Sequence, residues 1–203
     1  MPHITLSVAA GARSVDTGRL DFSPIEPFAV QGVFGGFCRR GFPVTSPLSE
    51  EEARARADAL ACRARRAREE GDEAAERRLL EEALPCFQAL AAGEDEATEA
   101  LADQLFRLGD LCRNGGDLAG AARQLALCVR LREQLAAAPC PAALDALACA
   151  QGALGLLPGA DPDHLEQAAR LWQALALQQP AEERYARLRD TCLRALERRW
   201  GER

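Results

Sequence analysis

The stretch LGDLCRNGGDLAGAARQLALC, residues 108–128, decides how this chain folds. On either side of Gly116–Asp117, apolar residues recur at intervals of three and four, which is typical of amphipathic helices. The Gly–Asp pair itself predicts a tight turn followed by a helix that Asp117 caps. Gly109 and Ala121 place small residues in the two predicted helices, where they allow close approach of the backbones. The stretch therefore predicts a helical hairpin.

The same pattern recurs elsewhere in the chain. A second pair, Gly71–Asp72, lies 45 residues before Gly116–Asp117, and a third turn occupies residues 158–164. Apolar residues at helical spacing follow each turn. Because one hairpin cannot bury its apolar stripe alone, repetition at this period predicts stacked hairpins.

From residue 49 onward the sequence predicts helices with short connections, so that neighbours in the chain lie antiparallel. Ser49 and Glu52 form a capping-box pattern at the first helix. Pro85 is expected to kink or break the second helix, because it lacks an N–H group and clashes with the preceding turn. The seven expected ranges are 49–70, 73–91, 96–114, 117–137, 141–156, 162–178 and 181–199.

The composition divides the chain near residue 48. Residues 1–48 contain five of the seven phenylalanines together with many prolines and glycines, but no pattern of a strand followed by a turn and a partner strand. We expect 1–48 to be an irregular tail of low order and 49–203 to be an all-α repeat domain.

Residues 105–128 resemble a tetratricopeptide repeat. The resemblance rests on residues that match the family's first helix, turn and second helix, namely Leu105, Leu108 and Gly109, then Gly116–Asp117, then Ala121, Leu125 and Cys128.

The resemblance is weaker in two other segments. In 57–84, Leu60 and Ala64 fit, but Glu76 occupies a position that is normally small. The spacing also exceeds the family's usual period of about 34 residues, and it is similar to the long-helix variants of kinesin light chains and spindle-orientation adaptors. In 144–180 the matching residues are Ala148, Ala168, Trp172 and Pro180.

This resemblance implies a right-handed α-α superhelix of about three hairpins, closed by a C-terminal capping helix. The capping helix is expected to use an apolar face that consists of Tyr185, Leu188, Cys192, Leu196 and Trp200.

The net charge of −6 argues against a general nucleic-acid binder, and the absence of lysine removes a catalytic or Schiff-base lysine. No apolar run reaches the roughly 20 residues that cross a bilayer, and the N-terminus lacks a secretory pattern. We expect a cytoplasmic protein, with nuclear and mitochondrial locations left open. The arginine-rich segment after residue 49 is interpreted as a solvated, salt-bridged face with the pairs Glu50–Arg54, Glu52–Arg56 and Glu73–Arg77.

The sequence offers no constellation that is typical of an enzyme, a metal centre or a cofactor site. Only two histidines, His3 and His164, could serve as bases, and none of the eight cysteines forms a CxxC motif. Asp161, Asp163 and His164 are adjacent, but helix capping explains them better than a metal site does. We therefore expect a non-enzymatic protein without a cofactor.

The resemblance implies that a partner peptide or helix binds in the concave groove that first helices line in this family. The lysine-based clamp of the chaperone-binding members is not expected, because the matching positions are Ala61, Arg65 and Arg107. The implied groove residues are Asp58, Arg65, Arg68, Asp103, Phe106, Arg107, Asp110, Arg113 and Asp145, with Cys149 beside the last.

Two functions follow as hypotheses. The first is a protein-binding adaptor or scaffold whose ligand carries both charges and an apolar anchor for Phe106. The alternative is a structural, self-assembling helical subunit, in a mitochondrial location for example, that associates through the apolar tail segment 28–42.

Overall fold

The computed structural model describes residues 49–91, 95–136 and 140–201. Within these ranges the protein is all-α, as predicted, and each of the seven helices begins and ends within two residues of its expected bounds. The predicted tail 1–48 lies outside the described residues. The helices are α1 (Glu50–Glu69), α2 (Glu73–Leu90), α3 (Asp95–Asn114), α4 (Leu118–Leu135), α5 (Pro141–Gly155), α6 (Asp163–Gln178) and α7 (Glu183–Gly201).

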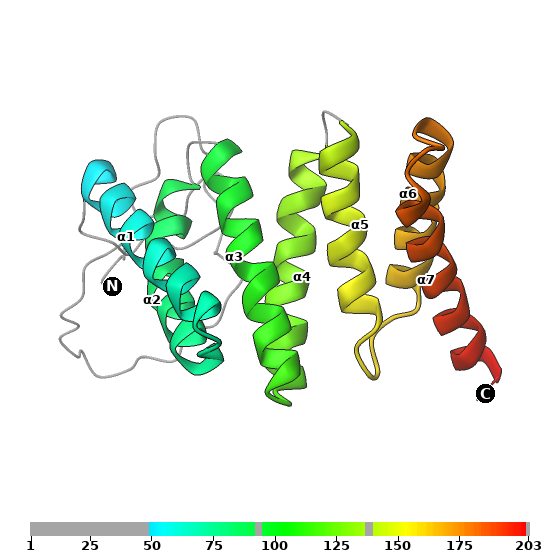
Figure 1. Cartoon of the computed structure of the whole chain (residues 1–203), viewed down its shortest axis with the longest axis horizontal. Helices are drawn as coiled ribbons and strands as arrows, with labels where there is room; N and C mark the ends of the chain where they lie inside the picture. Colours follow the sequence, from blue (N-terminus) through cyan, green and yellow to red (C-terminus); the bar gives the residue numbers. More distant parts are fainter. Residues whose placement is uncertain (1–48, 92–94, 137–139, 202–203) are drawn as a thin grey trace, which may run out of the picture. The chain divides into compact units, whose positions relative to one another are not determined.

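Helices that follow one another in the chain pack against one another (Figure 1). The most extensive contacts lie within the pairs α1–α2, α3–α4, α5–α6 and α6–α7, and smaller contacts join α2 to α3 and α4 to α5. Buried apolar residues form one cluster along α1 to α5 and a second along α5 to α7. This sequential, pairwise packing is what stacked helical hairpins require.

The first two hairpins turn in the same way. Gly71 and Gly116 have φ values of 76° and 79°, which glycine adopts without the steric cost of a Cβ atom. In both turns the following aspartate donates its backbone N–H across the helix end, to Ala67 O and Cys112 O respectively, at 2.8 Å. Two turns 45 residues apart thus share one backbone hydrogen-bond pattern.

Aspartate side chains then begin the next helices, as predicted. Asp72 accepts a hydrogen bond from Ala75 N at 2.9 Å, and Asp117 accepts one from Gly120 N at 2.8 Å. The predicted capping box of α1 is also present, with Glu52 N donating to Ser49 Oγ at 3.2 Å.

Asp117 has a second partner outside its own helix. Arg77 of α2 was predicted to pair with Glu73, but it pairs instead with Glu81 at 2.9 Å and with Asp117 at 3.1 Å. The hydrogen bond from Gly120 N–H and the contact with Arg77 hold the pKa of Asp117 below its ordinary value. One carboxylate therefore caps α4 and contacts the preceding hairpin.

The charged face of α1 is only partly as predicted. Glu50 and Arg54 pair at 3.5 Å. Glu52 is engaged by Ser49 in the capping box, and Arg56 reaches across to Glu82 of α2 at 3.3 Å. Arg56, which was predicted to pair within α1, thus pairs with a residue of α2.

Glycines line the seams inside two hairpins. A Cβ atom on Gly109 would lie 2.6 Å from Leu125 Cγ, so Leu125 occupies space that only glycine leaves open. Gly152 takes the corresponding place opposite Trp172, whose Cη2 atom would lie 3.0 Å from an added Cβ. Gly109 was predicted to allow close approach of the two helices, whereas Gly152 was not.

The predicted break at Pro85 is wrong, because α2 continues through it to Leu90. Pro85 and Glu81 are both exposed, and the loss of a helix hydrogen bond at a proline costs less on a side of the helix that water can reach. Cys86 and Phe87 directly after it are buried in the core, and their packing holds the last turn in place.

No helix in the described residues is both long enough and apolar enough to cross a membrane.

Replacing Gly109 with alanine is expected to destabilise the protein by about 1–2 kcal/mol. Overpacking against Leu125 costs about 1–3 kcal/mol, whereas alanine recovers roughly 0.5–1 kcal/mol of helix propensity. Chemical denaturation measures the difference. In a Leu125→Ala background the same replacement should be neutral or stabilising, and a loss of equal size there would contradict close contact at this seam.

Candidate functional site

Two of the nine predicted partner-binding residues are exposed and free of ion pairs with other described residues. Asp58 and Arg65 lie on α1, are exposed, and make no ion pair with another described residue. They are separated by two helical turns, so they share one face of the helix.

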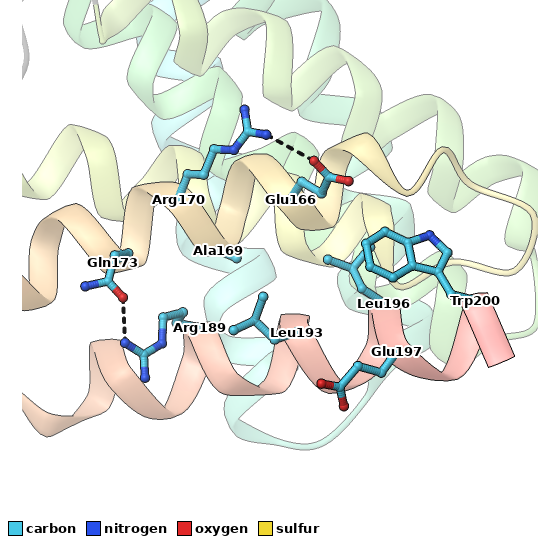
Figure 2. A pocket seen from close by; sticks show the side chains of 9 residues that line it. All are labelled: Glu166, Ala169, Arg170, Gln173, Arg189, Leu193, Leu196, Glu197 and Trp200. Carbon is cyan, nitrogen blue, oxygen red and sulfur yellow. Dashed lines mark hydrogen bonds and ion pairs between the residues drawn. The ribbon is translucent and has the colours of Figure 1, made fainter.

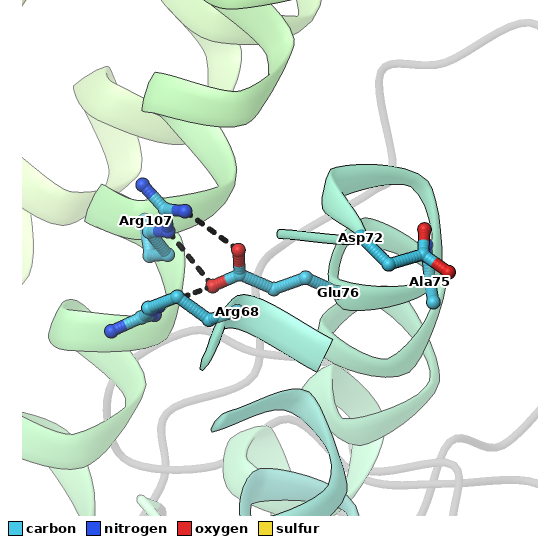
Figure 3. A network of polar contacts seen from close by, with 5 residues as sticks. All are labelled: Arg68, Asp72, Ala75, Glu76 and Arg107. Carbon is cyan, nitrogen blue, oxygen red and sulfur yellow. Dashed lines mark hydrogen bonds and ion pairs between the residues drawn. The ribbon is translucent and has the colours of Figure 1, made fainter. Parts of the chain in front are cut away.

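Two other predicted residues, Arg68 and Arg107, converge on a buried carboxylate (Figure 3). Arg68 Nε lies 2.6 Å from Glu76 Oε1, and Arg107 contacts the same carboxylate twice, through Nε at 2.8 Å and Nη2 at 2.6 Å. The Glu76 side chain is 0% exposed, while those of Arg68 and Arg107 are 50% and 27% exposed. We call Arg68, Glu76 and Arg107 the Glu76 cluster. It joins α1, α2 and α3.

The Glu76 cluster is charged at neutral pH. Burial raises the pKa of the Glu76 carboxyl, but hydrogen bonds from Arg107 and Arg68 more than offset this effect and bring the pKa below its ordinary value. The hydrogen bond to Glu76 correspondingly raises the pKa of Arg107. Two guanidinium groups around one carboxylate leave a net charge of +1, part of it at the surface. The sequence signal for this cluster was an acidic residue at a normally small position.

Asp103 and Phe106 on α3 are both contacted by Arg132 from α4. Arg132 Nη2 lies 2.6 Å from Asp103 Oδ1, and the guanidinium carbon lies 5.7 Å from the centre of the Phe106 ring. The Arg132 side chain is only 11% exposed, and its Nε atom is buried without an acceptor. Phe106 is thus half-buried between its helix and a cation, a favourable arrangement for an aromatic ring.

The remaining predicted residues also have partners. Asp110 and Arg113 pair with each other on α3 at 2.8 Å. Asp145 of α5 accepts a hydrogen bond from Trp172 Nε1 at 3.2 Å and pairs with Arg184 of α7. Its position joins three helices.

Cys149, predicted beside Asp145, is a poor nucleophile. Burial raises the pKa of its thiol, and the neighbouring carboxylate of Asp145 raises it further. The thiol is therefore protonated at neutral pH.

The acidic motif lies at the start of α6, as predicted, but the helix begins at Asp163 and its capping residue, Pro162, makes no side-chain cap hydrogen bond. Asp161 Oδ1 accepts a hydrogen bond from the backbone of Asp163 at 3.0 Å, and His164 Nδ1 lies 2.6 Å from Gln151 Oε1. Within residues 49–91, 95–136 and 140–201, no group of three or more His, Cys, Asp or Glu side chains could hold a metal ion.

A hollow of about 540 Å³ lies between α6 and α7, at residues that the sequence analysis did not assign to a site (Figure 2). Ala169 and Leu196 are buried there, whereas Leu193 and Trp200 are 43% and 55% exposed. The sequence placed Trp200 on the buried face of a capping helix, and this placement is wrong. Tyr185, Cys192 and Leu196 of that face are buried as predicted.

No protein-family model, characterised protein or solved structure matches this chain. Function is therefore inferred from the packing of the helices and from the residues at their surface.

Arg107→Ala should lower the free energy of unfolding by about 1–3 kcal/mol, because it removes two charged hydrogen bonds from a buried carboxylate. Arg65→Ala, the same change at an exposed residue, should stay within about 0.5 kcal/mol of the original protein. Equal effects in urea denaturation would contradict a structural role for Arg107.

The contribution of Glu76 should depend on pH. Its pKa is lower in the folded protein than in the unfolded chain, so its ionisation stabilises the fold above pH 4.5 and this stabilisation is lost as pH falls through the folded value. The difference in unfolding free energy between the original protein and Glu76→Gln should therefore be constant near neutral pH and shrink in acid. A difference that grows on acidification would contradict the assignment.

Proposed function

We propose that this chain is a non-enzymatic protein-interaction adaptor or scaffold, built from tetratricopeptide-like hairpins in a right-handed superhelix and capped by α7. Its partner, a peptide or helix, binds the exposed face of the first helices of successive hairpins, α1, α3 and α5. The two equivalent turns, the Gly109 seam and the sequential packing support the repeat assignment.

One observation carries the proposed function. Charged residues recur on α1 and α3 at a spacing of 45 residues, and they lie outside the apolar core. Packing of the core requires apolar residues at certain positions of these helices. It does not require charged residues at positions 45 residues apart. Such a stripe is suited to a partner of complementary charge. The pairs at this spacing are Asp58 and Asp103, Arg65 and Asp110, and Arg68 and Arg113.

The contacts of these residues specify the partner further. Asp58 and Arg65 are the predicted residues that make no ion pair with another described residue, so they can bind a ligand without loss of an internal contact. Phe106 supplies an apolar surface on α3. The partner should therefore offer an acidic group, a basic group and an apolar side chain.

A chaperone-type carboxylate clamp does not fit this proposal. The chain has no lysine, and Arg107 at a matching position is bound to Glu76. Arg65 can still contact an acidic group through its planar guanidinium.

Arg65→Glu should weaken capture of the partner roughly tenfold, which corresponds to about 1.4 kcal/mol, because it reverses an exposed charge on the binding face. The test uses the full chain as bait, quantitative recovery of partners from a lysate, and titration of each recovered partner. Arg63→Glu is the matched control, because Arg63 is exposed on a different face of α1.

Both variants should unfold at the temperature of the original protein. If Arg65→Glu and Phe106→Ala recover every partner at the original level, this face does not bind the partner. Arg107→Glu is unsuitable for this test, because it would place a second carboxylate beside buried Glu76 and unfold the site.

The alternative function, self-assembly through the apolar tail segment 28–42, concerns residues outside the described ranges. Deletion of residues 1–48 would remove this association, and light scattering would measure it.

A further inference from the structure

The hollow between α6 and α7 has the composition of a small interface. Its floor is apolar, with Ala169 6% and Leu196 3% exposed, and Leu193 and Trp200 extend the apolar surface into solvent. These two are among five large apolar side chains that are more than one third exposed in the described residues. Two large apolar side chains exposed side by side do not stabilise the fold, and such patches mark interaction sites.

Charges on α7 flank this apolar surface in a particular order. Arg189, Leu193 and Glu197 line the hollow at successive intervals of four residues, so they share one face of the helix. Figure 2 shows Arg189 at one end of the hollow and Glu197 at the other, with Leu193 between them. The order along the helix is cation, apolar residue, anion.

This order is complementary to itself. A two-fold axis through Leu193 sets two α7 helices antiparallel, and it brings Arg189 of each copy opposite Glu197 of the other. Self-complementarity of one patch is the property that a symmetric dimer contact requires.

Arg189 is already paired with Asp190 at 2.6 Å, but the internal contacts leave hydrogen-bonding capacity on both Arg189 and Glu197. Arg189 makes three hydrogen bonds, two to Asp190 Oδ1 and one to Gln173 Oε1, and a guanidinium has five N–H donors. Glu197 is exposed and pairs with no cation among the described residues. Two donors and one carboxylate per copy thus remain for an intermolecular pair.

A head-to-tail contact, in which α1 of one copy covers the α6–α7 hollow of another, fits the surface less well. The exposed face of α1 carries charged residues such as Arg54, Arg63 and Arg66, and none of the large exposed apolar residues lies on α1. Placing that helix on Leu193 and Trp200 would desolvate the charges of these arginines. A second copy of the α6–α7 face is the better occupant.

We propose that two copies of this chain associate through the α6–α7 hollow, with the α7 helices antiparallel, Leu193 at the two-fold axis and Arg189 of each copy paired with Glu197 of the other. The contact involves one helix pair per copy and lies at the small end of stable interfaces, so association is reversible and depends on concentration. It is independent of the proposed partner-binding face on α1, α3 and α5.

Sedimentation of the full chain over a wide concentration range tests the proposal. The average mass should rise from 21.9 kDa toward twice that value as concentration increases. Leu193→Arg should hold the mass at the monomer value, because it places two like charges at the axis. Leu177→Arg, at a 75% exposed residue of α6 outside the hollow, should leave association unchanged.

A charge exchange tests the register. Arg189→Glu and Glu197→Arg should each weaken self-association at least tenfold, whereas an equimolar mixture of the two variants should form a mixed dimer, because every pair across the axis is then of opposite sign. Circular dichroism establishes that each variant is folded. If Arg189→Glu does not fold, the comparison of Leu193→Arg with Leu177→Arg decides.

Three results would overturn the proposal. The first is an original chain that stays monomeric at all concentrations. The second is a dimer that persists in Leu193→Arg, which is the result expected if the contact runs through the tail 1–48. The third is an equal loss of self-association in Leu193→Arg and Leu177→Arg. If Leu193→Arg captures the partner at the original level and Arg65→Glu does not, the dimer contact and the proposed partner-binding face are different surfaces.

Discussion

The contact between Leu125 and the bare Cα of Gly109 sets the separation of α3 and α4, and the rest of the packing depends on that separation. Because Gly109 has no side chain, Leu125 fits into the seam and is itself 0% exposed. Gly152 and Trp172 repeat the arrangement in α5 and α6 with a larger partner. In both hairpins a glycine on the first helix leaves a space, and a large side chain of the second helix packs into it.

The first hairpin differs from the second at another buried position, on the second helix of the hairpin. Glu76 lies 45 residues before Ala121, and both are 0% exposed, so a carboxylate occupies the position that a methyl group fills in the next hairpin. Its burial is tolerated because Arg68 and Arg107 donate hydrogen bonds to both of its oxygens. As Arg107 belongs to α3, this solution also joins the first hairpin to the second.

Local chemistry made much of the fold predictable. Helix positions follow from apolar spacing, and the turns follow from Gly–Asp pairs whose conformation depends on adjacent residues alone. The partners of Arg68, Arg107 and Asp145 come from other helices, and the sequence gives no register between helices. These three residues, which were predicted to face a ligand, thus also make contacts between helices, and the sequence did not predict those contacts. Pro85 was misjudged for a similar reason, because its tolerance depends on which side of α2 faces solvent.

The two bonds from the start of α2 to the second hairpin have a consequence for how the protein opens. Glu76 contacts Arg107, and Arg77 contacts Asp117, the residue that caps α4. Separation of the first hairpin would strip a buried carboxylate of its main counter-charge and remove a neighbour from the α4 cap in the same event. Fraying from the α1 end is thereby coupled to loss of the next repeat. We therefore expect α1 through α4 to open as one cooperative unit in hydrogen exchange, rather than as two units in succession.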